Sequence, residues 1–167
     1  MIESAMEHSN NTPERMQRAS DALKYEIDMF RSLAAYFASG TVTTSVVACA
    51  LVESFLIHVR VLTDFLYPER NYKKRSRKKH DDIMAKNFFD PCDKWETIRP
   101  PKSSILEEAS TRANKLLAHL TYTRSESSLD QQSRVPQQIA EELEAVLSIF
   151  VENVPKEFLG SRWKTRS

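Results

Sequence analysis

The chain has 167 residues with 24 basic and 23 acidic side chains, so the overall charge neither favours nor excludes a nucleic-acid partner. Its length fits one domain with a single core. Only two glycines occur, which argues against a β-sandwich or a barrel, because those folds need many tight turns. The composition therefore indicates an all-α protein.

Targeting signals are not evident. No segment approaches about 18 consecutive apolar residues, and the N-terminus MIESAMEHSNN lacks a basic stretch followed by an apolar run. We therefore expect no membrane span and no signal peptide. Cys49 and Cys92 lie far apart in the sequence and have no metal-ligand spacing, which favours reduced thiols and a cytoplasmic location.

The first predicted helix follows a polar N-terminus, residues 1–11, that we expect to be disordered. Thr12 supplies a hydroxyl cap, and Pro13 and Glu14 suit the first turn. One face of this helix, ending near Gly40, repeats at steps of four and three and consists of Met16, Ser20, Leu23, Ile27, Phe30, Ala34 and Phe37.

The second predicted helix spans residues 42–67. Its β-branched start, TVTTSVV, leaves a strand possible, but the missing turn signals and the later period favour a helix. The apolar stripe consists of Leu51, Phe55, His58, Leu62 and Phe65. Because the connection to the first helix is so short, we expect an antiparallel helix hairpin.

A long basic excursion follows Pro68 and separates the second helix from the third. Within it, DDIMAKNFF is predicted as a short helix with Asp81 or Asp82 near its start. The next stretch, DPCDKWETIRPP, is predicted as an irregular segment that Trp95 and Ile98 attach to the core.

Two further long helices complete the predicted bundle. Ser104 with Glu107 three residues later forms a capping box for a helix that runs to about Thr123. Pro136 begins the last helix, whose wide apolar face consists of Ile139, Leu143, Val146, Leu147, Phe150, Val151 and Val154. We expect an all-α antiparallel bundle of four main helices over residues 12–159. A basic tail, 160–167, follows, with Phe158 and Trp163 holding the end of the chain to the bundle.

The third helix carries polar side chains among its leucines, in the stretch RANKLLAHLTYTR. Arg112 and His119 are seven residues apart, so they share one helix face about 10 Å apart, with Lys115 between them. His58 falls within the apolar stripe of the second helix and can converge with them where the two helices pack. Each of these residues also has a structural interpretation, as a satisfied core histidine or a solvated helix face.

On the second helix, Arg60 and Asp64 are one turn apart and can pair. We assign both residues, with His58, to a supporting role around the site. An ordinary surface pair is the alternative, worth only about 0.3–0.5 kcal/mol if exposed.

Arg112, six residues and His119 fit the R-x4–6-H pattern of the HEPN superfamily. The order of ESFLIHVRVLTDFLY, DDIMAKNFF, a tryptophan and NKLLAHLTYTR resembles an uncharacterised bacterial family of HEPN-like proteins, over about residues 45–125. The resemblance implies a four-helix bundle in which two protomers join their motifs in one cleft and cut RNA without a metal. It also implies a toxin–antitoxin or phage-defence context, with a cognate antitoxin as a further partner.

In catalytic relatives the arginine would contact the scissile phosphate, and the histidine would act as general acid or base. The resemblance carries these roles to Arg112 and His119, with Asn114 and Lys115 positioning the RNA backbone. Catalytic members usually have a polar residue directly after the arginine, whereas Ala113 stands there in this chain. Lys115 is therefore an alternative for the working cation. Many relatives with this fold have lost activity and only bind partners.

The basic excursion places six cations in seven residues, namely Lys73, Lys74, Arg75, Arg77, Lys78 and Lys79. Such a run repels itself, which predicts an extended, solvated loop. It could bind RNA phosphates without sequence specificity, with Tyr72 as a stacking ring. A loop that only increases solubility is the alternative.

Other chemistry lacks support in the sequence. No Gly-rich phosphate loop, GxSxG motif or Cys/His cluster occurs, and a metal site from His58, His119 and Asp64 is disfavoured because each residue has another use. We expect no cofactor and no metal. Two hypotheses remain: a homodimeric RNA-binding protein, with or without endoribonuclease activity, and a non-catalytic helical interaction module whose polar residues are structural.

Overall fold

The computed structural model describes residues 12–40, 46–68, 82–118 and 135–164, and these ranges contain helices and no strand. Four long helices pack together: α2 (Pro13–Ala38), α3 (Val46–Leu66), α5 (Ser104–Ala118) and α7 (Val135–Asn153). The predicted all-helical class with four main helices is therefore confirmed. The predictions for residues 1–11, 41–45, 69–81, 119–134 and 165–167 lie outside the described residues, and these include the first residues of the predicted second helix.

α2 has the boundaries that the sequence predicts. The Thr12 hydroxyl accepts a hydrogen bond from the Arg15 backbone N–H at 3.3 Å, and Pro13 occupies the first helical position. Gly40 follows the end of the helix with a φ of 70°, a left-handed conformation that glycine adopts without steric penalty.

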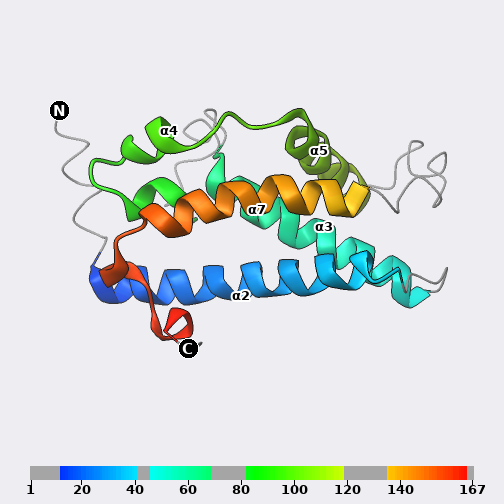
Figure 1. Cartoon of the computed structure of the whole chain (residues 1–167), viewed down its shortest axis with the longest axis horizontal. Helices are drawn as coiled ribbons and strands as arrows, with labels where there is room; N and C mark the ends of the chain where they lie inside the picture. Colours follow the sequence, from blue (N-terminus) through cyan, green and yellow to red (C-terminus); the bar gives the residue numbers. More distant parts are fainter. Residues whose placement is uncertain (1–11, 41–45, 69–81, 119–134, 165–167) are drawn as a thin grey trace.

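α2 and α3 form an antiparallel hairpin, as their contacts demonstrate. Phe37 and Phe30, near the end of α2, both pack on Phe55, with ring centroids 5.6 and 5.8 Å apart. Glu26, earlier in α2, meets His58, later in α3. α7 runs back alongside α2 in the opposite direction (Figure 1).

Aromatic rings fill the centre of the core. Phe150 of α7 makes edge-to-face contacts with the rings of Phe65, Phe88, Phe89 and Trp95, at centroid distances of 5.1–5.8 Å. These rings come from α3, from the short 3₁₀ helix η2 (Ala85–Phe88) and from the segment after it. The connection between α3 and α5 is thus part of the core.

That connection is more regular than its sequence predicts. The stretch DPCDKWETIRPP contains the short helix α4 (Lys94–Ile98) instead of being irregular throughout. Trp95 is fully buried, as expected, and its indole N–H donates to the Leu66 carbonyl at 2.9 Å. η2 lies where a short helix was expected, but its N-cap is Met84, not Asp81 or Asp82.

The start of α5 corrects one predicted cap. The helix begins at Ser104, but the hydroxyl that caps it belongs to Ser103, which accepts from the Leu106 N–H at 3.3 Å. The Ser103 carbonyl also accepts from the Glu107 N–H at 3.0 Å. The sequence alone does not decide which of the two adjacent serines caps the helix, because Ser104 fits a capping box with Glu107.

The described part of the tail lies against α2 (Figure 1). Two short 3₁₀ helices, η4 (Lys156–Phe158) and η5 (Ser161–Trp163), form this segment. The Trp163 indole N–H donates to the Ser20 carbonyl at 2.9 Å. Trp163 and Phe158 both pack against the core, as predicted.

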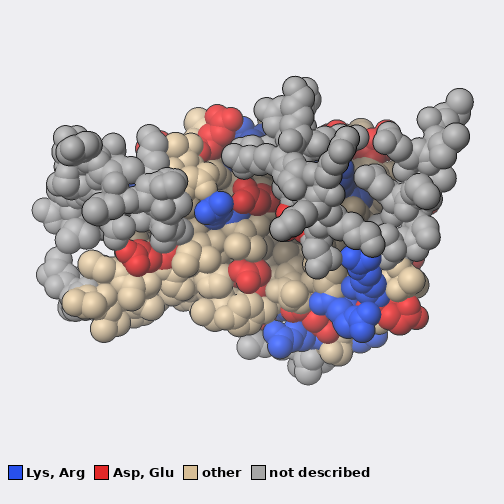
Figure 2. Space-filling view, turned by 180° about the vertical axis from the view of Figure 1, so that it is seen from behind, with Lys and Arg blue, Asp and Glu red and all other residues tan. Residues whose placement is uncertain are grey.

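α3 is long and apolar enough to cross a membrane by length and composition alone, although no unbroken apolar run signals this in the sequence. A core helix of a soluble protein passes the same test, and α3 buries residues of its second half from Phe55 to Leu66 against its neighbours. Its outer side leaves Val46, Val47, Ile57 and Val61 exposed. The face of the molecule in Figure 2 is largely uncharged at the end where α2 gives way to α3.

Candidate functional site

Arg112 lies beside the buried stripe of α5. That stripe consists of Leu106, Ala109, Ser110 and Ala113, and Arg112 is half-buried at its border. Within the part of the chain that the structure describes, the Arg112 side chain makes no hydrogen bond or ion pair. A guanidinium at the edge of the core, with no acid partner among the described residues, can bind an anionic ligand.

Asn114 does not accompany Arg112. Arg112 and Asn114 are two positions apart, which separates them by about 200° around the helix axis. Asn114 is exposed. The structure therefore does not bring this predicted supporting residue to the Arg112 side of α5. Lys115 belongs to α5, but its side chain lies outside the described part of the structure, as do His119 and the whole predicted basic run, residues 73–79.

Ala113 is fully buried, which explains in physical terms why this chain has no polar residue directly after Arg112. A polar side chain at this core position would need its own hydrogen-bond partner, since burial without one is costly. The position after the arginine is thus used for helix packing in this chain.

His58 is buried against α2 and has a partner there. Its Nδ1 lies 2.6 Å from the Glu26 Oε2, and the Tyr25 ring meets the imidazole edge-on at a centroid distance of 6.2 Å. The observed hydrogen bond of His58 thus joins α3 to α2, whereas the sequence suggested convergence with Arg112 on α5. This pair matches the alternative interpretation of His58 as a satisfied core histidine.

Arg60 and Asp64 form the predicted pair one helical turn apart, with Nε 3.7 Å from Oδ2. Both side chains are largely solvent-exposed, so the pair adds little to stability. No group of three His, Cys, Asp or Glu side chains among the described residues could hold a metal ion.

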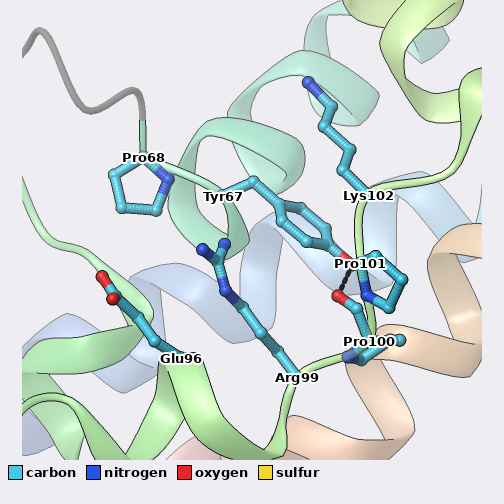
Figure 3. Close-up of a pocket in the computed structure, with 7 residues that line it drawn as sticks. All are labelled: Tyr67, Pro68, Glu96, Arg99, Pro100, Pro101 and Lys102. Carbon is cyan, nitrogen blue, oxygen red and sulfur yellow. Dashed lines mark hydrogen bonds between the residues drawn. The ribbon is translucent and has the colours of Figure 1, made fainter.

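A cavity of about 380 Å³ lies where α3 ends and α5 begins, a site that the sequence analysis missed (Figure 3). It is lined by Tyr67, Pro68, Glu96, Arg99, Pro100, Pro101 and Lys102. The segment RPPK contains two cations next to two prolines, a signal that was available in the sequence. Without the fold, however, nothing places this segment opposite Tyr67.

Arg99 is held in place at this cavity. Its Nη1 donates to the Leu66 carbonyl at 3.1 Å, and its guanidinium carbon lies 4.9 Å from the centroid of the Tyr67 ring. The Tyr67 hydroxyl donates to the Pro100 carbonyl at 3.0 Å. Burial raises the pKa of Tyr67 above its ordinary value, while the nearby Arg99 charge opposes that rise.

The chain matches no protein-family model, no curated protein and no solved structure.

Proposed function

We propose that the protein is a HEPN-like RNA-binding protein that cleaves RNA without a metal, in a site composed by two copies of the chain. The observation that carries the proposal is the position of Arg112: half-buried on α5, with no acid partner among the described residues. With His119 seven residues later, it matches the motif on which the resemblance depends.

In the proposed reaction, the His119 imidazole of one subunit takes the proton from the RNA 2′-hydroxyl. The 2′-oxygen attacks the adjacent phosphorus, and the bond from phosphorus to the 5′-oxygen breaks. The partner's His119 protonates the departing 5′-oxygen, which leaves a 2′,3′-cyclic phosphate and a 5′-hydroxyl. Arg112 stabilises the negative charge that develops on the phosphate oxygens.

A homodimer is part of the proposal because each chain supplies one Arg112 and one His119. The exposed apolar side chains of α3, Val46, Val47, Ile57 and Val61, support it, since such a surface favours association with another chain. A cognate antitoxin in a toxin–antitoxin or phage-defence pair is the further partner that we propose, with a cytoplasmic location.

The experiment is a cleavage assay of labelled RNA in excess EDTA. We expect Arg112→Ala to slow cleavage by about 10²–10³-fold, the usual effect of removing a donor to a developing anion. Arg18→Ala, which removes an exposed α2 arginine, is the matched control and should cleave like the wild type. Equal rates for the wild type and Arg112→Ala would exclude the role of Arg112.

A non-catalytic helical interaction module is the second candidate, and the His58–Glu26 pair favours it. In this candidate function, the polar residues fix how the helices align with one another. Glu26→Gln weakens a charge-assisted hydrogen bond of the mostly buried His58, so we expect a loss of about 1–3 kcal/mol in unfolding free energy. Thermal and urea unfolding measure it, and an unchanged melting temperature would contradict the structural role of the pair.

A further inference from the structure

We propose that the cavity between the end of α3 and the start of α5 is a phosphate-binding site, formed by Arg99 and Lys102, that holds a backbone phosphate of bound RNA. This inference rests on the proposed RNA-binding function and adds a contact point distinct from the Arg112 face of α5.

Two cations, Arg99 and Lys102, and one carboxylate, Glu96, line the cavity, and the charge of Glu142 also acts on Tyr67 beside it. Lys24 pairs with Asp28, and Arg31 forms a two-pronged pair with Glu144 elsewhere in the bundle. Arg99 and Lys102, in contrast, make no ion pair with a described residue. Glu96 lines the same cavity, and within the described residues no ion pair joins it to either cation. An anion entering the cavity would therefore find two cations that no carboxylate already occupies.

Arg99 is preorganised for such a ligand. The Leu66 carbonyl takes one of its five N–H donors, and the guanidinium carbon lies over the Tyr67 ring (Figure 3). The remaining donors stay available, and little side-chain entropy is lost when they bind. The guanidinium fork matches carboxylate and phosphate oxygens alike, and the second cation, Lys102, suits the further oxygens of a phosphate.

The carbonyl at the α3 end of the cavity is already hydrogen-bonded, which reduces its repulsion of a bound anion. The Leu66 carbonyl, which would repel negative charge, already accepts from the Trp95 indole and from Arg99. At the other end, α5 begins two residues after Lys102, so the positive end of its dipole adds to the field of the lysine. Prolines 100 and 101 separate the two cations without adding backbone donors that need partners.

The test measures binding of a fluorescent single-stranded RNA, made uncleavable by 2′-O-methylation, at several salt concentrations. Lys102→Ala removes a cation that makes no hydrogen bond to a described residue, and Arg99→Gln keeps an amide donor for the Leu66 carbonyl. Lys156→Ala, on the exposed side of η4, is the matched control. Thermal melting confirms that each variant is folded.

We expect each cavity variant to weaken RNA binding three- to tenfold. Each should also lower the slope of log K against log salt by about 0.7, the value for one phosphate contact on a single strand. The control should change neither quantity. RNA binding with unchanged affinity and slope in both cavity variants would overturn the phosphate site and leave the proposed function standing.

Inorganic phosphate is the second probe. Titration of ¹⁵N-labelled protein with phosphate should shift the Arg99 Nε–H signal, and Lys102→Ala should weaken that response. If phosphate produces this shift but no RNA binds, the anion site stands and the proposed function fails. If neither probe perturbs Arg99, the inference is wrong.

Discussion

At the residue scale, Tyr67 couples the cavity to the core through one hydroxyl. Tyr67→Phe removes the hydrogen bond to the Pro100 carbonyl but keeps the ring under Arg99. We expect a loss of about 1 kcal/mol in unfolding free energy at pH 7, measured by urea denaturation. An unchanged free energy would mean that water replaces the bond without loss.

Tyr67→Phe should also change how the stability of the protein depends on pH. Because burial raises the folded-state pKa of Tyr67, the neutral phenol contributes stability that is fully present below the unfolded pKa of about 10. That contribution is lost as the pH rises through the higher folded-state value. Tyr67→Phe should therefore lose less stability than the wild type between about pH 9 and pH 11. Parallel pH profiles of the two proteins would contradict this.

Gly160 allows the tail to approach α2 closely. Its N–H donates to the Ser20 hydroxyl at 2.8 Å, and a Cβ at this position would lie 2.3 Å from the Asp21 carboxylate. We expect Gly160→Ala to displace the tail and to lower the unfolding free energy by about 1–3 kcal/mol. Hydrogen exchange of the Trp163 indole N–H, which bonds to α2, should become faster.

The other glycine is the control for this test. Gly40 has open space around its Cα but a positive φ, so Gly40→Ala strains the backbone without touching the tail. It should destabilise by about 1–2 kcal/mol and leave exchange of the Trp163 indole unchanged. Equal exchange in both variants would contradict the role assigned to Gly160.

At the element scale, the start of α5 depends on one of two adjacent serines. Ser103→Ala removes the hydroxyl that accepts from the Leu106 N–H, so we expect a loss of about 1 kcal/mol, within the usual range for caps. Ser104→Ala changes an exposed residue in the first turn and should leave stability nearly unchanged. Chemical unfolding of both variants measures which one loses more stability. A larger loss in Ser104→Ala would indicate that Ser104 is the cap.

Elements with strong periodicity could be predicted from sequence, and residue pairs between elements could not. The start and the buried face of α2 could be predicted from Thr12–Pro13 and from the apolar stripe, because a helix cap and a hydrophobic period are local signals. The partner of His58 is 32 residues away on another helix, and no local pattern specifies it. α4 was missed for the opposite reason: a helix of five residues has no period to detect, and Trp95 stabilises it through tertiary contacts.

At the scale of the whole molecule, the fold places its two candidate anion contacts on different parts of the bundle. Arg112 lies along α5, and Arg99 with Lys102 lies at the junction of α3 and α5. The sequence motif predicted the first because R-x6-H is local to one helix. The second required the fold, because Tyr67 and Arg99 belong to segments that are joined by hydrogen bonds from Trp95 and Arg99 to the Leu66 carbonyl and from Tyr67 to the Pro100 carbonyl.

We propose that the chain cleaves RNA through Arg112 and His119 without a metal. The most direct measurement is the rate of RNA cleavage in EDTA by the purified wild type and by His119→Ala. We predict cleavage by the wild type that leaves 2′,3′-cyclic phosphate ends, and a loss of about 10²–10⁴-fold in the variant, the usual contribution of a general acid or base. Equal cleavage by the two proteins, or no cleavage by the wild type, would contradict the claim.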